Sequence, residues 1–247
     1  MRLRLIRHAT LQVDVGDRRV VVDPMLDPAA ARPPVEGTPN PRRNPLVELP
    51  EPAEVVIEGA AAVLVTHLHS DHLDDTAIAL LPRDVPVFCA PGDADTLRGH
   101  GFGDVRPVEA ELDWDGVRIA RTEGVHGSLG PTPGFVLDGL YIAGDTIWCD
   151  EFRDALDEHH PDVVVVNAGA ASYLEGDPIV MDADDVVATA RHAPDARIVA
   201  VHMEAINHCL QTRADLHQRL REEGLTDRVT VPEDGAEIPL AGTRRAS

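Results

Sequence analysis

The chain has 247 residues and no segment that reads as a linker, so we expect one domain spanning residues 1–247 with a sizeable core. Its formal net charge of -21 at pH 7 disfavours nucleic acid as a partner, because no basic run offsets the repulsion of phosphates. All 22 basic residues are arginine, a bias that fits either a GC-rich genome or a salt-adapted host.

The cysteines and the apolar segments indicate the cellular compartment in which we expect the protein. The three cysteines, Cys89, Cys149 and Cys209, are widely spaced and form no Cys-x-x-Cys pair, which favours a reducing compartment. No apolar run approaches the roughly 18 residues of a membrane-spanning helix. We therefore expect a cytoplasmic protein that acts on a small molecule and has no membrane partner. Assembly into a homo-oligomer is left open.

The N-terminal region reads as a short antiparallel meander followed by a long irregular segment. Leu3 and Leu5, then Val13 and Val15, alternate with polar residues, and a further strand is predicted at 19–22. Repeated prolines exclude regular structure over residues 27–52. A loop of this length in a compact domain is usually functional or disordered.

The densest group of chemically competent side chains lies between a predicted strand at 60–65 and a predicted helix at 74–81. Residues 66–72 read Thr-His-Leu-His-Ser-Asp-His, which puts three imidazoles and one carboxylate within six positions. Imidazole nitrogen and carboxylate oxygen are the usual ligands of zinc and of other borderline first-row ions. A His-rich surface loop is the alternative, but the strand-to-helix turn favours a metal site.

The remaining pattern alternates strands with helices and adds two hairpins. The turns of these hairpins are expected at 115–116 and at 138–139, where Asp-Gly is typical of a type I′ turn. Strands are predicted at 85–89, 105–108, 163–166, 197–201 and 229–231, and helices at 93–100, 150–159, 182–192 and 212–223. Meanders at both ends with alternation between them suit an α/β fold in which two sheets pack face to face between helices, a four-layer αββα sandwich.

The motif at 67–72, directly after an apolar strand, resembles the signature of the metallo-β-lactamase-fold hydrolases. His126, Asp145 and His202 follow in the order in which that family supplies its remaining ligands. More narrowly, residues 7–10 (Arg-His-Ala-Thr), the pair Asp23-Pro24 and residues 202–208 resemble the branch of the ascorbate-6-phosphate lactonase-like proteins.

The resemblance implies two divalent metal ions, with zinc favoured and manganese or iron as alternatives. One ion would be held by His67, His69 and His126, the other by Asp71, His72 and His202, with Asp145 bridging the two. Asp71, Asp145 and His202 are the residues expected to support catalysis, in which hydroxide at the ions attacks the substrate. His208 competes with His202 for the role of last ligand.

Several further residues are predicted near the substrate or behind the ligands. The resemblance implies that the loop at 27–52 covers the site as a lid, where Arg42 and Arg43 would contact an anionic substrate; a solvated loop is the alternative. His8, Glu204, Asn207 and His208 are candidates for substrate contact or for support of the ligands, and Asp23 is a candidate to orient a metal-binding histidine.

The leading hypothesis is therefore hydrolysis of a lactone, phosphoester or related ester or amide bond in a small anionic molecule. An iron-dependent oxidoreductase on the same fold is the first alternative, and no appended redox domain supports it. A nucleic-acid phosphodiesterase is disfavoured by the acidic charge, and a non-catalytic scaffold by the full set of expected ligands. A β-lactamase would follow from the fold name alone, which is poor evidence for a substrate.

Overall fold

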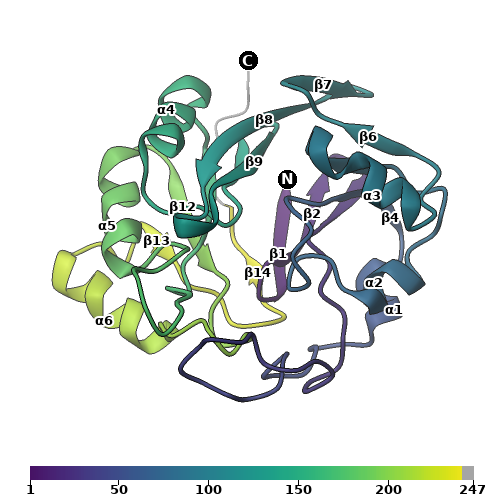
Figure 1. Ribbon diagram of the computed structural model, residues 1–247. Helices are drawn as coiled ribbons and strands as arrows, with labels where there is room; N and C mark the ends of the chain where they lie inside the picture. Colours follow the sequence, from purple (N-terminus) through teal and green to yellow (C-terminus); the bar gives the residue numbers. More distant parts are fainter. Residues whose placement is uncertain (241–247) are drawn as a thin grey trace.

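The computed structural model describes residues 1–240, so residues 241–247 of the expected domain lie outside the described part. Two seven-stranded sheets pack face to face, and helices cover both outer faces (Figure 1). α1 (Ala53–Ile57), α2 (Asp75–Leu80) and α3 (Ala94–Gly99) lie on one side, and α4 (Asp150–His159), α5 (Ala183–His192) and α6 (Arg213–Glu223) on the other. The expected αββα sandwich is confirmed.

Both sheets have the same arrangement of parallel and antiparallel pairs, although the sequence shows no repeat at the level of residues. Antiparallel pairs occupy one half of each sheet, and parallel pairs occupy the other half. The first sheet has the order β14 (Glu237–Ile238), β1 (Arg2–Arg7), β2 (Thr10–Val15), β3 (Arg18–Val22), β4 (Ala60–Leu64), β5 (Val87–Cys89) and β6 (Val105–Pro107). The second has the order β13 (Val229–Thr230), β12 (Arg197–Val201), β11 (Val163–Asn167), β10 (Leu140–Ile142), β9 (Pro131–Leu137), β8 (Val117–Val125) and β7 (Glu111–Trp114).

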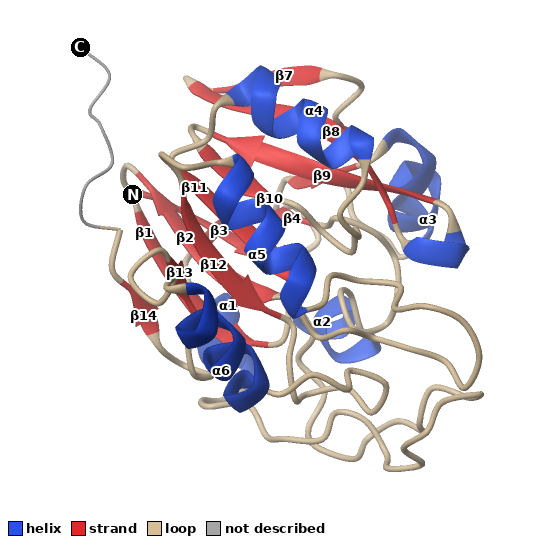
Figure 2. Cartoon of the chain, turned by 90° about the vertical axis from the view of Figure 1, so that its left-hand side faces the viewer, coloured by secondary structure: helices blue, strands red, loops and turns tan. Residues whose placement is uncertain are grey.

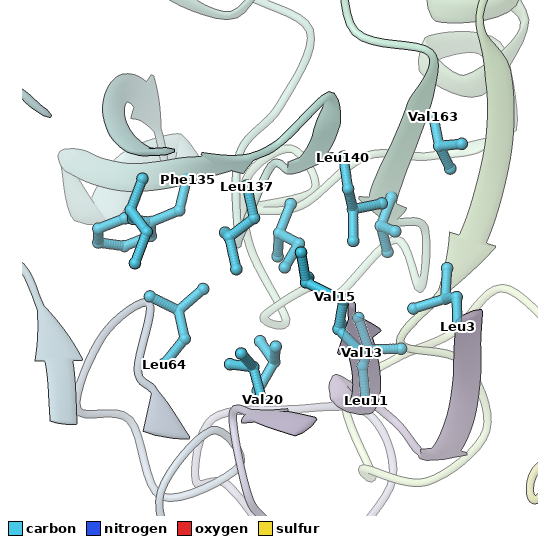
Figure 3. Packing of buried hydrophobic residues seen from close by; sticks show 14 of the residues in the cluster. Leu3, Leu11, Val13, Val15, Val20, Leu64, Phe135, Leu137, Leu140 and Val163 are labelled. Atoms are coloured by element: carbon cyan, nitrogen blue, oxygen red, sulfur yellow. The ribbon is translucent and has the colours of Figure 1, made fainter. Parts of the chain in front are cut away.

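The main core lies between the two sheets and is built from aliphatic side chains with few rings. Figure 3 shows Leu64 of the first sheet facing Phe135 and Leu137 of the second across this core. On β11, Val163 and Val165 point into it, whereas Val164 and Val166 pack under the helices. A strand buried on both faces needs apolar residues at every position, which explains the unbroken valines.

The two predicted hairpin turns are confirmed. Asp115 and Gly116 have φ values of 50° and 85°, and Asp138 and Gly139 have 47° and 86°, as a type I′ turn requires. β9 begins at Pro131, because residues 131–134 pair with the end of β8 despite their prolines and glycine. The short α1 and the edge strand β14 carried too little periodicity to be predicted.

Several site residues lie at or just after the ends of strands. Asp23 comes immediately after β3, Thr66 two residues after β4, Asn167 closes β11, and His202 follows β12. Two 3-10 turns, η1 (Pro91–Asp93) and η2 (Gly127–Leu129), complete the described elements. Figure 2 shows the loops gathered at one end of the sandwich.

Within residues 1–240, no helix is long and apolar enough to span a membrane.

Candidate metal centre

The loop after β4 folds tightly, so that its histidines converge. The backbone carbonyl of His69 accepts hydrogen bonds from the N–H groups of His72 (2.9 Å) and Leu73 (3.0 Å). Asp74 then caps α2 by accepting from the N–H of Ala77. The turn and the cap fix the direction in which the loop's side chains point.

The first of two clusters contains His67, His69, His126 and Asp145. Each residue offers one candidate ligand atom, and these atoms all lie within 4.8 Å of one another. His67 Nε2 and His69 Nδ1 lie 3.0 Å apart. Oδ2 of Asp145 is 3.3 Å from His126 Nε2 and 3.7 Å from His67 Nε2. Such separations suit ligands that surround one small ion.

The second cluster contains Asp71, His72 and His202, the expected ligands of the other ion, together with His8. Oδ1 of Asp145 lies 3.3 Å from Nε2 of both His72 and His202. His202 Nε2 is also 3.7 Å from Asp71 Oδ2. Asp145 therefore directs one oxygen at each cluster, and all seven residues expected as ligands meet at one place.

The polar atoms of these clusters fit a bound cation. Nε2 of His72 and Nε2 of His202 are buried and have no hydrogen-bond partner among residues 1–240. A buried polar atom left unpaired costs about 1–3 kcal/mol, so such atoms are rare without a ligand. Burial holds the pKa of His67 and of His202 well below the usual range, which leaves their lone pairs free at pH 7.

The carboxylates make the centre electronegative. Burial alone would raise the pKa of Asp145, but His202 and His72 lower it well below the usual range, and His8 does the same for Asp71. Burial likewise would lower the pKa of His72, yet Asp145 and Asp23 raise it well above normal. The carboxylates therefore favour positive charge at this cluster.

Asp23 holds the second cluster from behind. Its Oδ1 accepts from the N–H of Thr66 at 2.7 Å, and its Oδ2 accepts from the Thr66 hydroxyl at 2.7 Å and from His72 Nδ1 at 2.8 Å. The tautomer of His72 is therefore set, with Nε2 facing the cluster. This is the orienting position expected for Asp23 from the sequence.

His126 is oriented by the backbone of a distant loop. Its Nδ1 donates to the carbonyl of Ile179 at 2.8 Å, which leaves Nε2 toward Asp145. Gly127 permits this contact, because a Cβ there would lie 2.6 Å from Cα of Ile179 and φ is +46°.

Asn167 orients Asp145 and was not predicted. Its Nδ2 donates to Asp145 Oδ1 at 2.6 Å. The signal in the sequence is a single polar residue that ends an otherwise apolar strand, beside the strand that leads to Asp145. This signal identifies Asn167 only once the two strands are known to be neighbours in the sheet.

His8 lies behind the second cluster and is fully buried. Its Nε2 lies 3.2 Å from Asp71 Oδ2 and donates to that ionised carboxylate. Its ring centroid is 3.5 Å from that of His202, and its carbonyl accepts from the N–H of His202 at 3.0 Å. His8 therefore links the two sheets at the site, in a position that supports two expected ligands.

A cavity of about 290 Å³ opens onto both clusters. One side of it, the apolar wall, is formed by Val35, Leu129, Tyr173 and Ile179. His208 also lines the cavity but belongs to neither cluster, whereas His202 lies in the second cluster, where the last ligand is expected. Contact between His208 and a substrate stays a prediction.

Four other predicted contacts do not reach the cavity lining. Arg43 donates through Nε and Nη2 to the carbonyls of Ala30 and Ala31, and Arg42 is exposed outside the lining. Glu204 forms an ion pair with Arg213 at the start of α6. Asn207 is buried and fixes the proline-rich loop, accepting through Oδ1 from the N–H of Val35 at 2.9 Å. The loop therefore contributes a fixed part of the wall, without the two arginines.

The chain is similar to known proteins over most of its length. Residues 18–203 match the family model described as "Beta-lactamase superfamily domain". The UPF0173 protein YddR of Bacillus subtilis is 34% identical over 95% of this chain and 98% of its own length.

Two solved structures are similar over nearly the whole chain. An isothiocyanate hydrolase from Delia radicum gut bacteria is 36% identical with a TM-score of 0.92, covering 97% of this chain and 99% of that one. A possible metal-dependent hydrolase from Veillonella parvula is 32% identical with a TM-score of 0.91, covering 96% and 98%. The narrower likeness to the lactonase-like branch stays a prediction.

Proposed function

The chain belongs to the β-lactamase superfamily and is a metal-dependent hydrolase, and from that premise we propose that it uses two divalent ions to hydrolyse a small molecule with an apolar group. An isothiocyanate, the substrate class in the name of its 36% identical structural relative, is the first candidate. Lactones and phosphoesters, expected from the sequence, are the alternatives.

The observation that carries the two-ion proposal is the position of Asp145. Each of its carboxylate oxygens lies 3.3 Å from an imidazole nitrogen of a different cluster. One carboxylate can therefore serve both clusters, as bridging of two ions requires. The mixture of imidazole nitrogen and carboxylate oxygen suits zinc, and also manganese or iron.

When bound, the ions would supply hydroxide at neutral pH and positive charge that stabilises the developing anion. The chain's own residues hold the ligands in place. Asp23 and Asn167 fix His72 and Asp145 through the hydrogen bonds described above, and the clusters lie at strand ends, where the backbone is rigid. The ligands therefore need little rearrangement during turnover.

The apolar wall supports an uncharged substrate. Val35, Leu129 and Ile179 offer hydrocarbon surface beside the clusters, and no arginine among residues 1–240 lines the cavity. An isothiocyanate pairs an electrophilic carbon with an organic group that such a wall would bury. Its hydrolysis consumes one water and yields an amine and carbonyl sulfide. A phosphoester would instead bring negative charge to a cavity whose lining, in the described part of the chain, contains no arginine.

The test is a substrate panel with zinc-loaded protein. We expect the highest kcat/KM for an isothiocyanate with an apolar group, and much lower values for a lactone, a phosphomonoester and a phosphodiester. Isothiocyanate consumption should be matched by equimolar amine formation. Turnover of a phosphoester with no turnover of any isothiocyanate would overturn the substrate assignment, and the Asp145→Asn variant controls for hydrolysis by free zinc.

A further inference from the structure

We propose that His208 is a catalytic residue that carries a proton from the attacking water to the leaving atom of the substrate. The proposal rests on the hydrolytic function inferred above. It assigns a separate task to the one imidazole of the cavity lining that lies outside both metal clusters.

The position of His208 is that of a group held for contact with a ligand. It lines the same cavity as Asp71, His126 and Asp145. The residue is 7% exposed, and its Nδ1 is buried without a hydrogen-bond partner among the described residues. Because an unpaired buried nitrogen is costly, a ring that gains a partner only when substrate is present explains this arrangement.

Backbone contacts on both sides fix the ring relative to the cavity. The carbonyl of His208 accepts from the N–H of Ser172 at 3.0 Å, and Cys209 pairs with Ala171 in an isolated β-bridge. On the other side, the N–H of Asn207 donates to Asn44 Oδ1 at 2.8 Å. A proton carrier must stay within hydrogen-bond reach of both atoms that exchange the proton, and these contacts fix the backbone from which the ring extends.

The other imidazole and carboxylate groups of the lining are already engaged. His69, His126, Asp71 and Asp145 belong to the clusters, where a bound ion would occupy their lone pairs. Burial lowers the pKa of His208, so its ring is neutral at pH 7. A neutral imidazole has one nitrogen that accepts a proton and one that donates, which is what a two-way transfer needs.

For an isothiocyanate, R–N=C=S, the transfer balances without any other reactant. Oxygen from water bonds to the central carbon, the electron pair of the C=N bond moves to nitrogen, and that nitrogen takes up one proton. The product of this step is R–NH–C(=S)–OH. His208 then accepts the O–H proton and donates a proton to nitrogen while the C–N bond breaks. The O–H electron pair becomes the second bond of the carbonyl, which releases the amine and carbonyl sulfide.

The experiment compares His208→Ala and His208→Gln with the wild type on whichever substrate of the panel the wild type turns over best. General acid–base groups contribute about 10²–10⁴-fold, so kcat should fall by about that factor while KM changes little. Both variants should keep the metal content and melting temperature of the wild type. Added imidazole should restore part of the activity of His208→Ala and leave the wild type unchanged. His100→Ala, which removes an exposed imidazole outside the cavity lining, is the matched control.

Three results would overturn the proposal: an unchanged kcat, a loss that follows loss of metal, or a large loss without rescue by imidazole. These outcomes are separate from failure of the substrate assignment, which the wild type alone decides. If the wild type prefers a lactone, the isothiocyanate assignment fails, but the His208 variants are still tested on that lactone.

Discussion

The metal centre and the apolar wall lie on the same cavity but are built in different ways. The ligands of the centre stand on the loops that follow buried strands, and each of His72, His126 and Asp145 has a hydrogen bond that sets its direction. The wall comes from irregular segments, represented by Val35 and Tyr173. The expected metal ligands are therefore held close to the ends of the strands, whereas the apolar wall, which we propose selects the substrate, is formed by irregular segments.

The loops of the wall are nevertheless well anchored. Arg7 at the end of β1 is fully buried and donates to the carbonyls of Met25, Asp27 and Val47, which draws together the two ends of the proline-rich loop. Asn207 holds its middle through Val35 and Asn44. The loop interpreted from the sequence as a lid is fixed by residues far away in the chain. The difference between centre and wall predicts which changes affect metal and which affect substrate.

The largest effect is expected for Asp145→Asn, because this change removes the charge shared by both clusters. Metal content should fall, and kcat/KM should drop more than the roughly 10–100-fold typical of residues that only orient ligands. The fold should survive, since an amide retains the shape of the side chain. Metal analysis and steady-state kinetics measure both quantities; a variant with full metal and full activity would remove Asp145 from the bridging role.

A smaller effect on the same centre is expected for Asp23→Asn, which keeps a partner for the N–H of Thr66 but can no longer fix the tautomer of His72. Metal affinity should weaken by about 10–100-fold. Competition with a chelator of known affinity measures the change. The exposed turn variant Asp17→Asn is the matched control for loss of one negative charge; equal affinities for the two variants would argue against orientation by Asp23.

Asn207→Ala should disturb the wall and spare the centre. The change leaves the N–H of Val35 and the amide of Asn44 unpaired, at a cost of about 1–3 kcal/mol in the free energy of unfolding. We expect a lower melting temperature and a raised KM for apolar substrates, with two ions retained. Loss of metal from this variant would mean that the wall and the centre are not independent.

The smallest effect is expected for the double change of Arg42 and Arg43 to Ala. Arg43 binds only the exposed carbonyls of Ala30 and Ala31, and neither arginine lines the cavity. Surface changes of this kind usually alter stability by less than about 0.5 kcal/mol. KM should be unchanged for neutral and for anionic substrates alike; a selective rise for anions would restore the substrate contact expected from the sequence.

The same contrast explains how far the sequence could be interpreted. The ligands at 67–72 could be recognised because four of them share one short loop, and His126, Asp145 and His202 because each stands in a familiar order and local context. Asn167 could not be identified, because its role depends on β10 and β11 being neighbours in the sheet. Asp23 was recognisable, since its position directly after a strand fits an orienting role.

The wall could not be predicted because its position depends on contacts across long separations in the chain. Asn207 reaches Val35 across 172 residues, and no periodicity or motif connects them. Arg42 and Arg43 suggested an anion site through their charge alone, but charge does not show which way a loop turns. The sheets themselves followed from apolar patterning, apart from β14, whose two residues pair with β1 from the far end of the described chain.

The central claim is that two clusters hold two ions with Asp145 between them. The most direct test is anomalous scattering from crystals of zinc-loaded protein, combined with elemental analysis of the same sample. We expect two ions per chain, one among His67, His69 and His126 and the other among Asp71, His72 and His202, with each oxygen of Asp145 bound to a different ion. A single ion after reconstitution with excess zinc or manganese, or a second ion outside these residues, would contradict it.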